Sequence, residues 1–422
     1  MQQTQLVNNI EITKLSWFVS KCRQGIFDAL NRLDDACVEI IEQGNVQRLG
    51  NQDSELLGTM HIHDMSVYSD IAKGGGLGAA QAYIDKKWDS SDLTKLIRVF
   101  ARSQKILDEL EKQASWTNKL QSKLLSLKNR NTQEGSKKNI LAHYDLGNEL
   151  YTRFLDDKMM YSSAIYQKPE MTLSEAQTAK LALICEKLSL KPTDTLIEIG
   201  TGWGGLAIYA ATHYGCHVTT TTISDEQYAY AQQQVESLGL SDKITLLNKD
   251  YRLIEGQYDK LVSIEMIEAV GHEFMAEFFD KCSSLLKADG KMLIQAITIA
   301  DQRYDEYRKS IDFINKYIFP GGCLPSMAVI SQHIATSTDM MIDNVQDIGL
   351  HYAKTLHDWR VNFDAQWDDI KEHGYDEQFQ RLWHYYLSYC EGAFIERVIS
   401  THHVVARKPR YQDAVDEAIL NY

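Results

Sequence analysis

The chain has few prolines, no long apolar run and no paired-cysteine motif, and each absence excludes a class of protein. Five prolines in 422 residues, together with 44% hydrophobic residues, are typical of an ordered globular chain rather than a disordered one. No apolar run reaches the roughly 20 residues that a transmembrane helix needs. The start, MQQTQLVNNIEITK, lacks the basic-then-apolar order of a signal peptide. A chain of this length predicts two or three domains.

Seven cysteines are scattered along the chain without the C-x-x-C spacing of zinc or redox sites. They predict reduced thiols in a cytoplasmic protein with no metal centre. The net charge of −14 argues against nucleic-acid binding, because proteins that bind nucleic acids present a basic face. An acidic chain is also an unexpected partner for an anionic membrane, although net charge does not describe local patches.

Composition divides the chain into three zones, with an N-terminal domain over 1–115, a basic helical linker over 116–138 and a third region over 139–422. The lysine-rich helical pattern around the linker has two interpretations. It is a solvated connecting helix, or a surface helix whose lysines contact acidic lipid headgroups. Interspersed glutamates slightly favour the first. A glycine-rich run at 74–78 does not follow a clear strand, which favours a tight packing turn over a phosphate loop.

After residue 139, strand and helix signals alternate, which is typical of βαβ units around a parallel sheet. The expected strands span 195–199, 217–221, 244–248, 258–264 and 291–298. The expected helices span 173–188, 205–213, 225–237 and 273–286. A late amphipathic run at 402–407 predicts an antiparallel edge strand. The sequence therefore predicts an α/β fold with a Rossmann-like sheet.

The most informative stretch is TLIEIGTGWGGLAIY, at 195–209. A short apolar strand that contains Glu198 meets a glycine-dense turn at Gly200 and Gly202, and a helical pattern follows at once. Such a turn lets the backbone approach a ligand and directs free N–H groups toward it. The E-x-G-x-G spacing differs from the dinucleotide pattern G-x-G-x-x-G and is the one used for S-adenosylmethionine (SAM). The stretch therefore predicts transfer of a methyl group or a methylene.

Polar side chains follow the next two expected strands, where ligands of open α/β sheets bind. Thr222 and Gln227 suit ribose hydroxyls. An alternative is that Ser224 only N-caps the next helix while Gln227 closes a capping box. Tyr251 and Arg252 follow the third strand and suit adenine, by stacking and by hydrogen bonding.

Two acids three residues apart, Glu265 and Glu268, follow the fourth strand, where either carboxyl could titrate abnormally if desolvated. Aromatic-rich segments at 143–166 and 314–326 suit either a tunnel for an alkyl chain or an ordinary core. Composition alone favours the core.

Four of these segments, in this order and spacing, resemble the cyclopropane-fatty-acyl-phospholipid synthase family. They are HYDLGN at 143–148, MYS at 160–162, EIGTGWGG at 198–205 and YIFPGGCLPS at 317–326. The resemblance covers about 139–407 and extends through GGGLGAAQAYIDKKWD toward the N-terminus. It implies a class I methyltransferase sheet with helical insertions, and a smaller N-terminal α+β domain associated with lipid.

The resemblance also implies an activity, in which a methylene from SAM is added across a cis double bond of an acyl chain in a membrane phospholipid. It further implies a homodimer in the cytoplasm, held peripherally at the inner membrane. It assigns cofactor binding to Tyr161, Ser162, Glu198, Gly200, Gly202, Thr222, Ile223, Gln227, Tyr251 and Arg252. It assigns substrate contacts to Tyr317 and Phe319, within the aromatic segments.

In the family, a bicarbonate ion accepts the proton, and the resemblance assigns its binding to Glu268, Tyr352 and the backbone of Ile297. Two positions depart from the family pattern, with Ser163 in place of a cysteine and Gln295 in place of a histidine. Both still donate hydrogen bonds, although glutamine cannot carry charge. Methyl transfer is unaffected by these departures, whereas ring closure is less firmly implied. The alternatives are methylation without ring closure and a non-catalytic lipid-binding protein.

Overall fold

A computed structural model describes residues 16–104, 131–132, 135 and 146–413, and the chain divides into two compact units at 1–118 and 119–422. The expected linker, 116–138, and the start of the motif at His143 lie almost entirely outside the described residues. The domain boundaries drawn from the sequence therefore stay a prediction.

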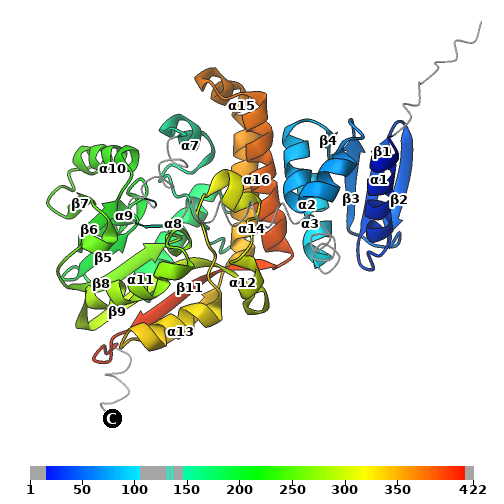
Figure 1. The fold of residues 1–422 in the computed structure, drawn as a ribbon. Helices are drawn as coiled ribbons and strands as arrows, with labels where there is room; N and C mark the ends of the chain where they lie inside the picture. The colour runs from blue at the N-terminus through cyan, green and yellow to red at the C-terminus, as the bar shows by residue number, and fades with distance from the viewer. Residues whose placement is uncertain (1–15, 105–130, 133–134, 136–145, 414–422) are drawn as a thin grey trace, which may run out of the picture. The chain divides into compact units, whose positions relative to one another are not determined.

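The N-terminal unit is a small α+β structure, as expected, built on a mixed four-stranded sheet of order β2-β1-β3-β4 (Figure 1). Its elements are α1 (Trp17–Leu30), β1 (Cys37–Glu42), β2 (Asn45–Gly50), β3 (Leu57–Ile62), α2 (Val67–Ile84), β4 (Trp88–Asp89) and α3 (Leu93–Arg102). Helix α3 packs tightly on β3, because a Cβ at Gly58 would lie 2.8 Å from the Leu96 Cα.

The glycine-rich run at 74–78 lies within α2 and not in a turn between elements. The helix is interrupted at Gly75, where φ is 56° and ψ is −137°. Beyond this kink the chain packs closely against the first half of α2, since a Cβ at Gly78 would overlap the carbonyl oxygen of Asp70. Gly78 therefore serves close packing, the role that the sequence favoured for the run, whereas a Cβ at Gly74 would meet nothing within 4 Å.

The second unit is built on a seven-stranded sheet of order β10-β11-β9-β8-β5-β6-β7. Strands β5 to β9 are parallel, and β11 runs antiparallel between β9 and β10. The strands are β5 (Thr195–Ile199), β6 (His217–Thr222), β7 (Ile244–Asn248), β8 (Tyr258–Ile264), β9 (Leu286–Ile299), β10 (Met341–Asp347) and β11 (Ile399–Arg407).

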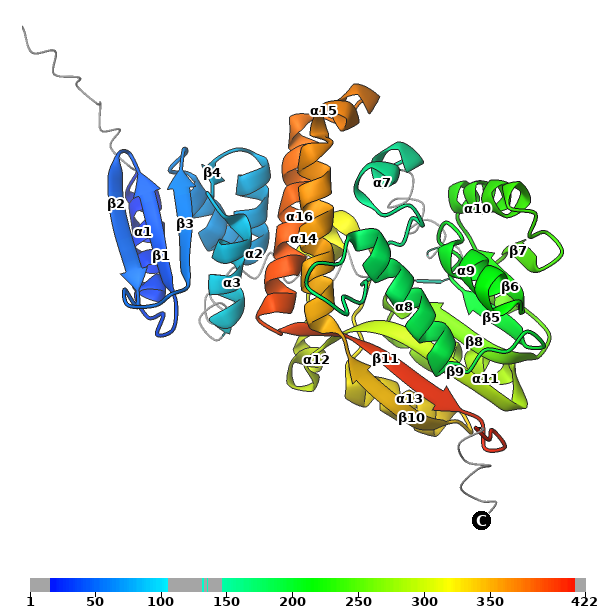
Figure 2. The ribbon, with the colours of Figure 1, turned by 180° about the vertical axis from the view of Figure 1, so that it is seen from behind.

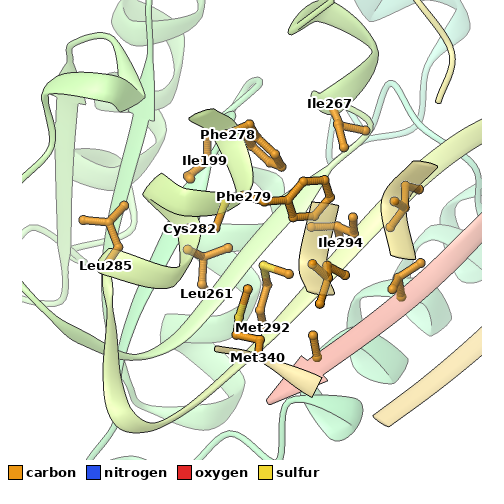
Figure 3. Close-up of a cluster of buried hydrophobic side chains, with 14 of the residues drawn as sticks. Ile199, Leu261, Ile267, Phe278, Phe279, Cys282, Leu285, Met292, Ile294 and Met340 are labelled. Atoms are coloured by element: carbon orange, nitrogen blue, oxygen red, sulfur yellow. The ribbon is translucent and has the colours of Figure 1, made fainter. Parts of the chain in front are cut away.

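Helices cover both faces of this sheet, and each face has its own hydrophobic core. Side chains of α11 and α13 cover one face (Figure 3). Those of α8, α9 and α10 cover the other. Neighbouring strand residues alternate between the cores, as Met292 and Leu293 do. The helices are α8 (Leu173–Lys187), α9 (Gly205–Tyr214), α10 (Asp225–Ser237), α11 (Met275–Ser284), α12 (Asp301–Tyr307) and α13 (Met327–Ser337).

Two long helices, α14 (Gly349–Ala365) and α16 (Glu377–Ile395), lie side by side, and the short α15 (Trp367–Ile370) joins their ends (Figures 1 and 2). Trp359, Phe363 and Trp383 are fully buried in this insertion. Helix α7 (Asn148–Phe154) packs on α14. Helix α14 reaches the carboxyl end of β8, since its Tyr352 hydroxyl donates to Glu265, the residue after that strand.

The main correction concerns the late strand. Strand β11 is antiparallel, as expected, but it does not form the edge of the sheet, because β10 pairs with its outer side. The β10 sequence, MIDNVQD, has apolar residues at Met341, Ile342 and Val345 and so lacks the apolar alternation that would predict a strand, and every residue of β10 is exposed. Strand β9 also begins earlier than expected, at Leu286, where the expected helix of 273–286 has already ended.

No helix in the described part of the chain is both long enough and apolar enough to span a membrane.

Candidate active site

The glycine turn after β5 has a backbone that only glycine adopts without strain. Gly200, Gly202 and Gly204 have φ of +101°, +54° and +93°. A Cβ at Gly202 would meet nothing within 4 Å, so this glycine faces open space. At Gly205, in contrast, a Cβ would lie 2.5 Å from the Met160 sulfur, so that glycine serves packing.

This turn fits the amino-acid end of SAM. Helix α9 starts at Gly205, so its first N–H groups are available to a carboxylate beside the turn. Glu198 at the end of β5 is 2% exposed and accepts a hydrogen bond from the Thr220 hydroxyl at 2.6 Å. Burial raises the pKa of Glu198 to about 8, so this carboxyl is largely protonated at neutral pH.

The residues after β6 form a local hydrogen-bonded cluster. Ser224 N-caps α10 through the Gln227 N–H, as the sequence predicted. The expected capping box does not form, because the Gln227 side chain accepts from the Thr222 hydroxyl at 2.9 Å instead. The Ser224 N–H donates to the same Thr222 oxygen. Ile223, between them, is half-buried.

After β7, Tyr251 and Arg252 lie in a single turn of 3₁₀ helix. The Tyr251 ring packs edge-on against Phe278 at 5.6 Å. The guanidinium of Arg252 pairs with Asp250 at 2.6 Å. The two predicted adenine contacts therefore lie at the carboxyl end of β7, with Arg252 held by its neighbour.

The loop before α8 carries three predicted site residues in a row, and the first is surrounded by aromatic rings. The ring of Tyr161 lies 5.2 Å from Trp359, and its hydroxyl is 2.9 Å from that of Tyr386. The rings of Tyr151, Phe154 and Phe319 lie 5.3, 6.1 and 6.4 Å from the Tyr161 ring.

The second residue, Ser162, is held by two buried polar side chains of α8. Its hydroxyl accepts from Lys180 Nζ at 2.8 Å, and its carbonyl accepts from Gln177 Nε2 at 2.9 Å. Both α8 side chains are fully buried. Burial lowers the pKa of Lys180 to about 8, and the negative charge of Glu265 opposes this change.

The third residue, Ser163, contacts the carboxylate of Glu265, which lies at the centre of the site. Oε1 of Glu265 accepts from the Ser163 N–H at 3.1 Å and from Gln295 Nε2 at 2.6 Å. Oε2 accepts from the Tyr352 hydroxyl at 2.8 Å. Glu265 is half-buried as a residue, whereas its three partners are buried. The structure thus brings together three predicted residues around a fourth that was not assigned.

The Ser163 hydroxyl does not join this group, because it donates to the carbonyl of Ala164. Burial raises the pKa of Glu265, while the bonds from Gln295, the Ser163 N–H and Tyr352 oppose the rise. All three partners donate to the carboxylate, and this arrangement stabilises the ionised form.

Glu268 lies one turn further on and has different partners. Its Oε1 accepts from the backbone N–H of Ile297. Its Oε2 is buried and has no hydrogen-bond partner among residues 16–104, 131–132, 135 and 146–413. The pKa of Glu268 is raised to about 8, mainly by burial and secondly by the negative charge of Glu265. Glu268 is therefore largely a neutral acid at pH 7.

A further chain of hydrogen bonds fixes the amide of Gln295. Its Oε1 lies 2.9 Å from Nε2 of His403, which faces it across the β9–β11 pair. An amide oxygen only accepts, so this ring nitrogen carries the proton. Nδ1 then accepts from Lys187 Nζ at 3.2 Å. Burial lowers the pKa of His403 to about 3, in keeping with a neutral ring.

The two predicted substrate residues lie in the segment after α12. Tyr317 belongs to a single π-helical turn, Ile314–Ile318, and packs against Phe313 at 5.3 Å. Phe319 approaches Tyr386 at 6.3 Å as well as Tyr161. Phe319 therefore belongs to the aromatic group around Tyr161, whereas Tyr317 contacts Phe313, which lies outside that group.

Sequence reasoning did not assign Glu265, Lys180 or His403. Glu265 was noticed only as one of two acids. For Lys180 a signal exists, because it falls three residues after Gln177 on the face of α8 that also carries Leu181 and Ile184. Polar residues on an apolar helical face need internal partners.

Comparisons with known proteins agree with this architecture. A family described as mycolic acid cyclopropane synthetase matches residues 131–404. The cyclopropane-fatty-acyl-phospholipid synthase of Escherichia coli is 36% identical over 349 residues, which are 82% of this chain and 87% of that protein. The tuberculostearic acid methyltransferase UfaA1 of Mycobacterium tuberculosis is 35% identical over 332 residues, 77% of each chain.

A solved structure of mycolic acid cyclopropane synthase CmaA1, complexed with SAH and CTAB, superposes with a TM-score of 0.61 at 32% identity. It covers 64% of this chain and 98% of that one. A coclaurine N-methyltransferase structure, at 20% identity and a TM-score of 0.60, shares the fold. The chain therefore belongs to the family of SAM-dependent methyltransferases that includes the cyclopropane-fatty-acyl-phospholipid and mycolic acid cyclopropane synthases.

Proposed function

We propose that this enzyme adds the methyl carbon of SAM to a cis double bond of an unsaturated acyl chain in a membrane phospholipid, and closes a cyclopropane ring. The observation that carries the proposal is the position of Ser162 and Ser163. Ser162 belongs to the predicted cofactor site, and the next residue donates to the Glu265 carboxylate. A methyl donor and a proton acceptor can therefore act on one substrate carbon.

When bound, SAM supplies an electrophilic methyl group, and the residues of this chain orient it. The open space before Gly202 would receive its amino-acid end, while Thr222 and Gln227 would hold the ribose. Tyr251 and Arg252 would lie at the adenine. Because an isolated alkene is a poor nucleophile, positioning and exclusion of water are the main contributions of the protein.

The aromatic group around Tyr161 would receive the acyl chain at its double bond. Rings of Trp359, Phe154 and Phe319 lie within 6.4 Å of the Tyr161 ring. Their π faces would stabilise the positive charge that develops on the chain after methyl transfer. Tyr317 would contact the alkyl chain further from the reacting carbons.

The second candidate is methylation of the acyl chain without ring closure. A specific observation favours it, because UfaA1, named a tuberculostearic acid methyltransferase, is as similar to this chain as the E. coli cyclopropane synthase is. The non-catalytic alternative is set aside, because the family consists of methyltransferases and the glycine turn is complete.

The proposed substrate would bring the enzyme to a membrane surface, and we extend the proposal to a homodimer bound peripherally to the cytoplasmic face of the inner membrane. In the N-terminal unit, Trp17 and Phe18 are exposed at 76% and 46%, which suits insertion between lipid headgroups.

The test is incubation of the purified enzyme with methyl-labelled SAM and vesicles of an unsaturated phospholipid. Ring protons and one added CH₂ per acyl chain support cyclopropane formation. A labelled methyl branch without ring protons selects the second candidate. No label in the acyl chains, with SAM bound, contradicts both.

A further inference from the structure

Bicarbonate, the proton acceptor implied by the family resemblance, does not fit the residues of this site. Four donors that would bind the anion are already used by the protein. Ser163 N–H, Gln295 and Tyr352 all donate to Glu265, and the Ile297 N–H donates to Glu268. Among the residues that the structure describes, the protonated carboxyl of Glu268 is the one donor of this group left without a partner, and an anion bound to it would lie beside the Glu265 carboxylate, where like charges repel.

We propose that Glu265 is itself the proton acceptor of the reaction, so that this enzyme needs no bicarbonate. The proposal rests on the one-carbon transfer proposed above. The carboxylate is fixed by donors on the loop before α8, on β9 and on α14, so its orientation is set by three separate elements.

Glu265 also lies next to the predicted cofactor turn. The neighbouring residue, Met266, packs against Gly200, where an added Cβ would lie 3.4 Å from its side chain. Ser163, which binds the carboxylate, adjoins Ser162 of the cofactor loop. The proposed acceptor therefore lies between the predicted cofactor turn and the loop of Ser162.

The reaction balances with this group alone. The bond from the sulfonium sulfur to the methyl carbon breaks, and that carbon bonds to one alkene carbon, leaving a cation on the other. Oε1 or Oε2 of Glu265 takes a proton from the added carbon, and the released electron pair closes the ring. The products are SAH, the cyclopropane and protonated Glu265, which returns its proton to solvent.

The backbone of Glu265 is a second, independent sign of function. Its φ is +49°, in the left-handed region that a glutamate enters only under strain. Such strain persists where the side chain has a role. The positive φ also makes Glu265→Gly a useful variant, because glycine adopts this backbone without strain and leaves a space the size of a small carboxylate.

The test compares wild type, Glu265→Gln and Glu265→Gly in CO₂-free buffer, with and without added bicarbonate or formate, using labelled SAM and phospholipid vesicles. Ser189→Gly is the matched control, because Ser189 also has a positive φ, of 53°, and lies outside the site. SAM affinity, measured by calorimetry, reports on folding of the cofactor site in each variant.

We expect wild-type turnover to be independent of bicarbonate. Glu265→Gln should lose about 100-fold or more in kcat while SAM affinity is retained. Glu265→Gly should lose as much and regain activity with bicarbonate or formate, an effect that a structural role for Glu265 would not produce. Ser189→Gly should behave as wild type throughout.

A wild-type enzyme that requires bicarbonate would overturn the proposal, as would a Glu265→Gln variant with nearly unchanged kcat or a Glu265→Gly variant that no anion rescues. A wild-type enzyme that modifies no acyl chain, with or without bicarbonate, would instead refute the proposed function.

Discussion

Replacement of Glu268 by glutamine should change how the stability of the protein depends on pH. Glu268 is half-buried as a residue, but its Oε2 atom is inaccessible to solvent, and the pKa of its carboxyl is raised to about 8. An unfolded chain has a glutamate pKa of about 4.3. Between these values the folded state binds a proton that the unfolded state has released, so stability falls as pH rises.

The size of the effect follows from the two pKa values. A carboxyl that titrates near 8 when folded and near 4.3 when unfolded removes on the order of 3 kcal/mol of stability between pH 5 and pH 8. Glutamine has the shape of the protonated acid and does not titrate. Glu268→Gln should therefore be close to wild type in stability at pH 5 and more stable at pH 8. Glu198, whose pKa is also about 8, leaves a residual slope of the same sign.

Calorimetric melting temperatures from pH 5 to pH 8 measure this slope, with the exposed Glu255→Gln as the control. A difference on the order of 3 kcal/mol should appear as several degrees at pH 8. If Glu268→Gln and wild type lost melting temperature in parallel over this range, the Glu268 carboxyl would not be protonated in the folded protein, and its assignment as a neutral acid would be wrong.

Three further predictions concern the cofactor turn, the Gln295 amide and the N-terminal unit. Gly202→Ala should abolish SAM binding measured by calorimetry, because its Cβ would fill the space before the turn. Gly205→Ala should instead lower the free energy of unfolding by about 1–3 kcal/mol, because its Cβ would meet Met160. Equal SAM affinity in wild type and Gly202→Ala would refute the proposed cofactor site at the turn. His403→Leu should leave the Gln295 Oε1 without its donor, which should cost about 1–3 kcal/mol of stability. The same change should lower kcat more than it lowers SAM affinity. An unchanged kcat would show that the Gln295 amide does not need to be positioned by His403. Trp17→Ser with Phe18→Ser should weaken vesicle binding in flotation assays while leaving SAM binding intact, and unaltered flotation would exclude these side chains as the membrane contact.

The sheet was predictable from the sequence because its central strands are apolar on both faces. Strand β5 buries Leu196, Ile197 and Ile199 in succession, which gives a short apolar run before the glycine turn. Strand β10 was not predictable, because all of its side chains are exposed and only its pairing with β11 makes it a strand.

The candidate site was predictable only in part. Ser163, Gln295 and Tyr352 were identified through the family resemblance, but their common partner was not. Glu265 lies 102, 30 and 87 residues from them in the sequence, so no local pattern links the four. The glycine turn, in contrast, is a contiguous motif, and its glycines alone indicate a backbone with positive φ angles.

The most direct test of the central claim is lipid analysis of cells that express the protein and are fed methyl-labelled methionine. We expect phospholipid acyl chains that gain one labelled CH₂, with ring protons in their spectra, and no such chains in cells that express Gly202→Val. Acyl chains that carry no label, in cells where the folded protein binds SAM, would contradict the assignment of an acyl-chain substrate to this enzyme.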